Sequence, residues 1–341
     1  MKIPKTLFFI LMFTSAHIFH HLLTVILIPL LPLIRDGFGL SYAQSGAVVS
    51  AFSLAYGFGQ LPAGWLSDRL GPRYLLLAGI SGVAVAGLLI GISTSYLSLL
   101  LFLVLLGILG GGYHPSASPL ISGAVPPSHR GRAIGLHIVG GSMSNFLSPL
   151  VAVFIAGYIG WRGSYLAISL PVFVFGLWLF FLMLRNDIRA RRAAAVSPEA
   201  GEAPTATEPD TMVSEENEPG DESESSAPRE PLPVLVIVLV MSASIGAAIG
   251  AAVSFVPLLA VDTLDVDQKS AALLLSLYFA VGMAAAPAGG MLADRFGPLK
   301  LLFILAVLAG PVILLIGIIP SWGIMAVVML VLGTVAFIRM T

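Results

Sequence analysis

The 341-residue chain contains no cysteine, so disulfide bonds, thiol catalysis and cysteine-ligated metal sites are excluded. Charge is also scarce: charged residues make up 10% of the chain, against roughly 25% in soluble domains. No G-x-x-x-x-G-K-[ST] loop is present, so ATP is not expected to drive the protein. No catalytic triad or paired carboxylates are visible, and we expect neither an enzyme nor a bound cofactor.

Apolar sequence is abundant instead, with 57% hydrophobic residues and a mean hydropathy of +0.97. A membrane-spanning helix needs roughly 20 mostly apolar residues, and backbone groups in lipid need internal hydrogen-bond partners. The sequence therefore predicts an all-α integral membrane protein. The first run is expected to be a retained span and not a cleaved signal peptide. The predicted spans are 7–34, 42–66, 74–93, 96–122, 131–158, 164–184, 233–261, 270–292, 299–319 and 321–341.

The basic residues fix an expected orientation. Most of them fall at the N-terminus and in alternate loops, whereas the opposite loops hold only Arg35, Arg162 and Lys269. Because cytoplasmic loops carry an excess of Lys and Arg, we expect a cytoplasmic N-terminus in a multi-pass protein of the inner (plasma) membrane. Basic residues placed for topology argue against a nucleic-acid partner.

Residues 185–232 interrupt the apolar pattern with an Arg-rich start followed by an acidic, Pro- and Ser-rich stretch. Such a composition cannot bury enough apolar surface to fold, so we expect a disordered cytoplasmic linker, with a regulatory tail as the alternative. The linker would divide a six-helix bundle (1–184) from a partial, four-helix bundle (233–341). The missing pair of helices favours a C-terminally truncated chain.

A charged turn occurs twice in the sequence. Residues 64–73 read GWLSDRLGPR and residues 290–300 read GMLADRFGPLK, so Gly290, Asp294 and Gly297 follow their counterparts by 226 positions. A charged turn repeated between apolar helices indicates a transporter built from internal repeats. The residues of this turn are Gly64, Asp68, Arg69, Gly71 and Arg73 in the first copy.

This turn resembles the signature turn of the major facilitator superfamily, and the repeat, the linker position and the charge asymmetry agree with that resemblance. It implies the major facilitator fold and alternating access. It also implies that the two turns are conformational latches: Asp294 and Arg295 would lie near Arg130 at the start of the fifth helix, while Asp68 would face a helix beyond Thr341. The alternative is a turn that only fixes topology.

A finer resemblance is to the fosmidomycin-resistance group of efflux proteins. It depends on His21-Leu-Leu with Pro29-Leu-Leu-Pro32, on Gly110-Gly-Gly-Tyr-His114-Pro115, on the glycine-rich helix-5 segment with Arg130 and Gly140, and on Gly160-Trp-Arg-Gly163. The resemblance implies export of a small drug-like or anionic compound against a proton gradient. Two departures are Val25, where the group has an acid, and Ser144 and Ser148, where it has glycines.

No Asp or Glu lies inside a predicted span, so histidines are the titratable groups expected in the membrane. Ionisable residues there are functional candidates, and histidine can carry a proton near neutral pH. We select His21 and His114 as proton-coupling candidates, against a simple helix-to-helix hydrogen bond. For His17, His20 and His137 the structural role is preferred. A metal site at His17-x-x-His20-His21 is disfavoured, because no carboxylate or thiolate lies nearby in the sequence.

Further candidates come from helices that line the central cavity in the superfamily. Arg339 would attract an anionic substrate if it faces that cavity, and would otherwise lie at the cytoplasmic surface. The cavity-lining candidates are Gln60, Tyr113, His137, Asn145, Tyr278 and Arg339.

The sequence favours a monomeric secondary transporter whose partners are a small-molecule substrate, protons and the lipid bilayer, with proton-coupled efflux as its activity. One alternative is uptake of an organic anion or sugar by the same fold. The other is a non-transporting membrane sensor that uses the acidic segment as its output.

Overall fold

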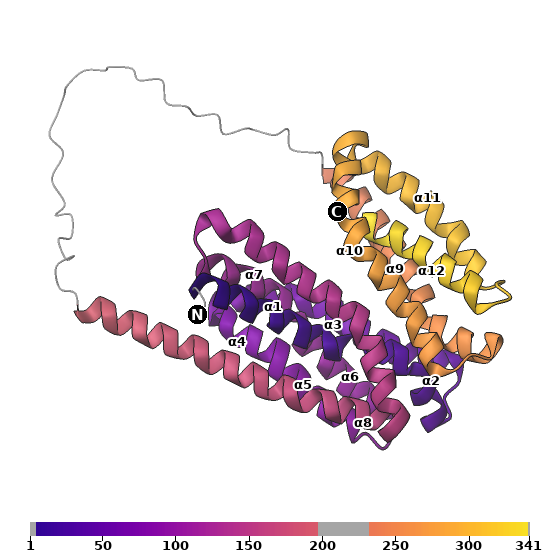
Figure 1. Cartoon of the computed structure of the whole chain (residues 1–341), viewed down its shortest axis with the longest axis horizontal. Coiled ribbons are helices and arrows are strands. Elements are labelled where there is room, and N and C mark those ends of the chain that lie inside the picture. Colours follow the sequence, from indigo (N-terminus) through magenta and orange to yellow (C-terminus); the bar gives the residue numbers. More distant parts are fainter. Residues whose placement is uncertain (1–4, 197–231, 340–341) are drawn as a thin grey trace.

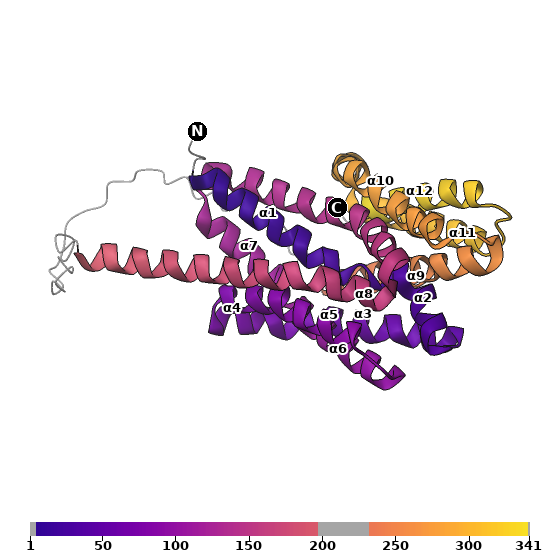
Figure 2. The ribbon, with the colours of Figure 1, turned by 60° about the horizontal axis from the view of Figure 1, so that its bottom comes forward.

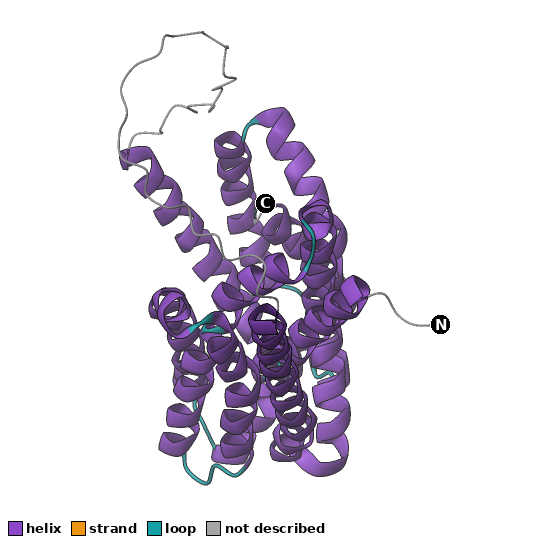
Figure 3. Ribbon diagram, turned by 90° about the vertical axis from the view of Figure 1, so that its left-hand side faces the viewer, coloured by secondary structure: helices purple, strands orange, loops and turns teal. Residues whose placement is uncertain are grey.

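The computed structural model describes residues 5–196 and 232–339, which form helices and connecting turns without a β-strand (Figure 3). The N-terminal half contains α1 to α8 and the C-terminal half contains α9 to α12 (Figure 1). The helices of the N-terminal half are α1 (Lys5–Thr24), α2 (Leu27–Phe38), α3 (Tyr42–Leu70), α4 (Pro72–Leu77), α5 (Val83–Gly91), α6 (Tyr96–Gly111), α7 (Tyr113–Ala124) and α8 (Arg130–Val196). Those of the C-terminal half are α9 (Leu232–Leu264), α10 (Gln268–Phe296), α11 (Pro298–Ile316) and α12 (Trp322–Ile338).

Several predicted spans consist of two shorter helices, and in two of them the break lies next to a proline, which removes a backbone hydrogen bond. The first span is α1 followed by α2, and the break at Val25–Ile26 begins four residues before Pro29. The fourth span is α6 followed by α7, with Gly112 between them and Pro115 just beyond. The third span joins α4 to α5 through a π-helical turn at Ala78–Gly82.

The fifth and sixth predicted spans are both in α8, which turns sharply at Ile159 and Gly160. Gly160 has φ +71°, a conformation that glycine adopts without the strain that a Cβ would add. After the sixth span, α8 continues to Val196 and projects beyond the neighbouring helices (Figures 1 and 2). The prediction that the linker begins at residue 185 is therefore wrong for 185–196, where Arg and Ala are good helix formers. Residues 197–231 lie outside the described part of the chain.

The two copies of the charged turn adopt the same backbone geometry. Gly71 has φ +97° and ψ +137°, and Gly297 has φ +84° and ψ +138°. Each glycine ends one helix by donating its N–H to the carbonyl four residues earlier, at 2.9 Å to Ser67 and 2.8 Å to Ala293. A proline begins the next helix in both copies. The sequence repeat is thus a structural repeat.

The repeat extends into the packing of each half. A Cβ on Gly107 would lie 2.7 Å from the carbonyl oxygen of Phe52, and one on Gly333 would lie 2.5 Å from that of Tyr278. Both residues of the second pair follow their counterparts by 226 positions. Glycine permits the same close approach of helix backbones in both halves, α3 against α6 and α10 against α12.

Each half has its own hydrophobic core, and the two halves meet along α2, α8, α9 and α10. Leu258 of α9 and Ala272 of α10 are buried within the core of the N-terminal half, and Ile28 of α2 packs on the core of the C-terminal half. From this contact region the helices of the two halves diverge toward the end that holds the described N-terminus (Figure 1).

Candidate functional site

Five of the six histidines lie in one cluster inside the N-terminal half. His17, His20 and His21 come from α1, His114 from α7 and His137 from α8. The ring of His17 is central: its centroid lies 4.1 Å from that of His137, 4.7 Å from that of His21 and 5.3 Å from that of His114. Positions 17 and 21 share one face of a helix because they are four residues apart.

Glycines make room for these rings. A Cβ on Gly141 of α8 would collide with the imidazole of His17, and a Cβ on Gly79 would lie 2.9 Å from the Cα of Tyr113. Tyr113 is fully buried and stacks on His20 with centroids 4.2 Å apart. The small residues of the sequence thus position aromatic and imidazole rings in a closely packed layer between α1, α7 and α8.

Backbone carbonyls fix three of the five rings. The Nδ1 atoms of His17, His20 and His137 lie 2.7 Å from the His137 oxygen, 2.7 Å from the Gly79 oxygen and 3.0 Å from the Phe13 oxygen, respectively. A carbonyl only accepts hydrogen bonds, so each Nδ1 carries the proton. The remaining Nε2 of His20 lies 3.0 Å from the Tyr56 hydroxyl, whereas the Nε2 of His17 is buried without a hydrogen-bond partner.

His21 and His114 differ from the other three because both are partly exposed. The His21 carbonyl accepts a hydrogen bond from Ser148 of α8, at 3.5 Å, and two residues earlier the Phe146 carbonyl accepts one from Ser276 of α10, at 2.8 Å. The backbone of His21 is therefore joined to the C-terminal half through one turn of α8.

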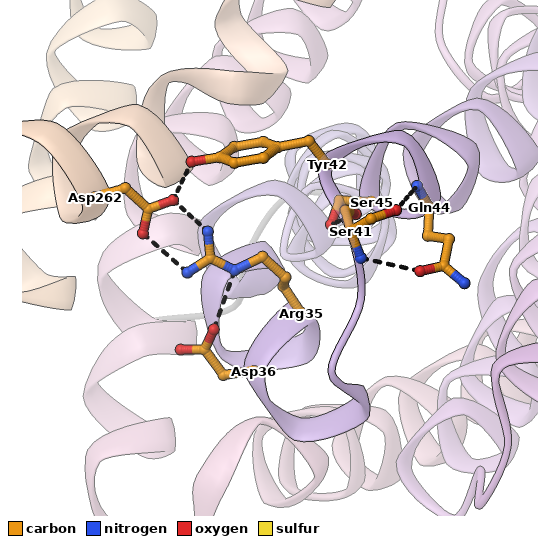
Figure 4. A network of polar contacts seen from close by, with 7 residues as sticks. All are labelled: Arg35, Asp36, Ser41, Tyr42, Gln44, Ser45 and Asp262. Atoms are coloured by element: carbon orange, nitrogen blue, oxygen red, sulfur yellow. Dashed lines mark hydrogen bonds and ion pairs between the residues drawn. The ribbon is translucent and has the colours of Figure 1, made fainter.

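A group of polar side chains near the C-terminal end of α2 joins the two halves. Arg35 of α2 donates to both carboxylate oxygens of Asp262 in α9, with 2.9 Å between Nη2 and Oδ1, and the Tyr42 hydroxyl donates to the same carboxylate (Figure 4). Arg35 also contacts Asp36 of its own helix, at 3.0 Å. A bidentate arginine–carboxylate pair gives directional as well as electrostatic attachment. Arg35, Tyr42 and Asp262 together are called the interhelical gate below.

The sequence matches the Major Facilitator Superfamily over residues 13–341. The chain belongs to this superfamily. Its fold is also that of a crystal structure of a bacterial homologue of the human lysosomal transporter Spinster, in an inward-facing and occupied conformation, with a TM-score of 0.73, 19% identity and coverage of 99% of this chain and 74% of that chain. The predicted fold class is confirmed, and the apolar helices identify a multi-pass membrane protein.

Two relatives of this chain are named for different transport activities. A probable sulfoacetate transporter, SauU of Cupriavidus necator, is 32% identical over 50% of this chain and 40% of its own length. A tetracenomycin C resistance and export protein of Streptomyces glaucescens is 32% identical over 48% of this chain and 30% of its own length. The matches thus span less than half of each relative.

Asp68 and Asp294, the acidic residues of the two signature turns, form no ion pair among the described residues, and the expected Asp294–Arg130 contact is not made. Arg130 instead donates to the Ser122 carbonyl, at 3.0 Å. The other turn arginines lie over nearby aromatic rings: Arg69 over Trp65, Arg73 over Tyr74 and Arg295 over Phe296.

The remaining candidates occupy different environments. Tyr113 and His137 are buried inside the N-terminal half and do not line an open surface. The Oδ1 atom of Asn145 is buried without a partner, and Gln60 is partly exposed. The ring of Tyr278 is tilted against that of Phe337, with centroids 5.6 Å apart. Arg339 donates to the Ser242 carbonyl at 2.8 Å and lines a cavity of about 200 Å³ between α9, α10, α11 and α12.

The interhelical gate was missed by sequence reasoning, although a signal for it exists. Asp262 follows Asp36 by the repeat distance of 226 positions. Arg35, which adjoins Asp36 in the sequence, pairs with both of these carboxylates. The charge distribution alone places Arg35 in a loop opposite the basic side and does not pair it with an acid.

Proposed function

We propose that the protein is a secondary active transporter that works by alternating access and couples proton movement to the efflux of a small organic or drug-like compound. In this mechanism two helical bundles rock about a site near the middle of the membrane. Support comes from the superfamily membership, from the relative named as a resistance and export protein, and from the histidine cluster beside the junction of the two halves.

The observation that carries the coupling proposal is the gathering of five imidazoles in a part of the membrane domain without a carboxylate. Among the described residues, both ion pairs involve Arg35 and neither involves a cluster histidine. His21 and His114 are the partly exposed members, so they are the ones that a proton can reach from outside the cluster.

We further propose that the structure is the conformer open toward the cytoplasm. The positive-inside distribution assigns the gate to the outer side, where Arg35, Tyr42 and Asp262 hold the halves together. The halves diverge toward the other end, which carries both signature turns (Figure 1). In that conformer Asp294 would be released from its latch contact with the start of α8, and closure of the cytoplasmic side would form that contact.

Efflux in inverted membrane vesicles tests the proposal. Replacing His21 or His114 with Gln keeps a polar side chain of similar size but removes a titratable group. Each replacement is expected to abolish substrate-dependent proton movement, measured by recovery of a pH-sensitive dye. The His129→Gln variant is the matched control, because this histidine lies in the short turn Pro127–His129, outside the cluster. Unchanged proton movement in both cluster variants would reject the coupling role.

A second candidate is uptake of an organic anion. It is favoured by Arg339, whose Nε is buried without a partner, and by the relative named as a probable sulfoacetate transporter. Transport assays in right-side-out and inverted vesicles with sulfonates and sugar acids separate the candidates: accumulation of an anion in right-side-out vesicles, lost in the Arg339→Gln variant, would favour uptake.

A further inference from the structure

We propose that His17, His21 and His114 form a binding site for a divalent transition-metal cation such as Zn²⁺. One nitrogen from each of these three rings lies within 4.8 Å of the other two. Two of the ligands are four residues apart on α1 and the third comes from α7 across the helix interface. Paired histidines at this spacing present both imidazoles on one helix face, which is the arrangement of helical zinc motifs.

The state of His17 supports a ligand role. Its Nδ1–H donates to the backbone carbonyl of His137, at 2.7 Å, so the lone pair is on Nε2. This Nε2 atom is buried and has no hydrogen-bond partner. A metal-binding histidine characteristically donates its other ring N–H to a carbonyl or carboxylate, which fixes both the tautomer and the ring orientation. His17 thus has an oriented, unused donor atom.

The other two cluster histidines are not part of the proposed site. His20 uses Nδ1 with Gly79 and Nε2 with Tyr56. The Nδ1 of His137 donates to Phe13 as that of His17 does to His137, but the nitrogens that converge within 4.8 Å are those of His17, His21 and His114. The run His17-x-x-His20-His21, which the sequence offers as the obvious chelate, is therefore not the proposed ligand set. The fold replaces His20 with His114, ninety-odd residues away along the chain.

The donor set indicates the class of cation. Neutral imidazoles suit Zn²⁺, Cu²⁺, Ni²⁺ and Co²⁺, whereas Mg²⁺ and Ca²⁺ require oxygen ligands. Three protein ligands leave a fourth tetrahedral position for water or an anion. The metal site does not depend on the proposed function, but the effect of the metal on transport rests on it. A cation bound to His21 and His114 would occupy the lone pairs that a coupled proton needs, and would inhibit proton-coupled transport.

The test uses Co²⁺ as a spectroscopic probe and Zn²⁺ as a competitor, on the whole chain purified in detergent with a tag that contains no histidine. We expect visible absorption typical of low-coordinate Co²⁺ at about one cation per protein, displaced by Zn²⁺. The His17→Gln, His21→Gln and His114→Gln variants should each weaken binding roughly tenfold or more, while His129→Gln should bind as the unmodified protein does.

Absence of the low-coordinate spectrum in the unmodified protein would overturn the site without reference to any variant, so a variant that fails to fold does not decide the question. Loss of binding in His129→Gln with retention in the three cluster variants would also overturn it. The outcome is independent of the coupling proposal: a His21→Gln variant that loses proton movement but retains Co²⁺ affinity would overturn the metal site and leave the proposed function standing.

Discussion

Replacing Asp262 with Asn should open the outer side of the protein. The substitution removes the charge from a carboxylate that accepts two hydrogen bonds from Arg35 and one from Tyr42. No other ion pair among the described residues joins the two halves, since the second pair, Arg35–Asp36, lies within α2. In the proposed orientation the gate would stabilise the outward-closed conformer selectively, because its partners come from both halves.

The expected magnitude follows from burial. The Arg35 and Asp262 side chains are 16% and 22% exposed, so the pair is neither fully solvated nor fully desolvated. Hydrogen bonds to charged groups contribute about 1.5–3 kcal/mol, and exposed ion pairs about 0.2–1 kcal/mol. An intermediate loss of about 1–2 kcal/mol corresponds to a shift of roughly 5- to 30-fold toward the outward-open conformer.

The absence of cysteine makes this shift measurable. Ala272 of α10 is 1% exposed and packs in the core of the N-terminal half. A single Ala272→Cys substitution therefore creates a thiol that an impermeant maleimide reaches from outside only when the halves separate. Because the labelling rate follows the open fraction while that fraction is small, Asp262→Asn should raise the rate roughly 5- to 30-fold. Cysteine at the exposed Tyr158 should label equally fast in both backgrounds.

The matched control is Asp36→Asn, which removes the other carboxylate beside Arg35 but leaves the bond between the two halves. It should leave the labelling rate within a factor of about two. An unchanged rate in Asp262→Asn, or an equal increase in Asp36→Asn, would refute the gate. Exchange of the two charges, Arg35→Asp with Asp262→Arg, should restore slow labelling.

Two glycine substitutions test the packing of the N-terminal half. Gly141→Ala should lower the stability in detergent by about 1–3 kcal/mol, because its Cβ would collide with His17. Gly135→Ala on the same helix meets no atom within 4 Å and should be neutral or stabilising. Equal melting temperatures of the two variants would contradict the clash. Gly160→Ala should lower the free energy of unfolding by about 1–3 kcal/mol, because φ +71° and ψ +171° lie in a backbone region essentially restricted to glycine. Gly157→Ala, which also meets no atom within 4 Å, is the control.

The fold followed from the sequence because lipid leaves few choices. Apolar runs without internal charge must become helices, and the repeated turn predicted equivalent corners that Gly71 and Gly297 confirm with nearly identical φ and ψ. The error at residues 185–196 has the opposite origin. The Arg-rich segment was assigned to the linker by its charge, but continuation of an existing helix needs only good local propensity and no new nucleation.

The histidine cluster was predicted only in part, because helical periodicity describes one helix at a time. Helical periodicity puts His17 one turn from both His20 and His21, but it turns His20 away from His21 by roughly 100°. Contacts from α7 and α8 close around both faces of α1, so all three belong to one cluster. Which residues meet across helices depends on glycine positions such as Gly141, whose effect is three-dimensional.

Serine hydrogen bonds connect α8 both to α1 and to the C-terminal half. Ser144 donates to the Ile18 carbonyl of α1, at 2.8 Å, and Ser148 donates to the Ser144 carbonyl. Between them, the Phe146 carbonyl accepts a hydrogen bond from Ser276 of α10, at 2.8 Å. One turn of α8 therefore contacts the histidine-bearing helix on one side and the C-terminal half on the other.

This arrangement indicates how the cluster and the gate would communicate. Along the chain they are joined by the α1–α2 span, but that route is interrupted at Val25–Ile26, where the helix can bend without transmitting a displacement. Between helices, one regular turn of α8 connects the two regions: Ser144 contacts Ile18 of α1, and Phe146 contacts Ser276 of α10. Separation of the halves must break or move the Ser276 bond, and α8 would pass that change to the backbone beside His17 and His21. We infer that coupling follows the lateral route through α8, because packed helices transmit motion and a broken helix absorbs it.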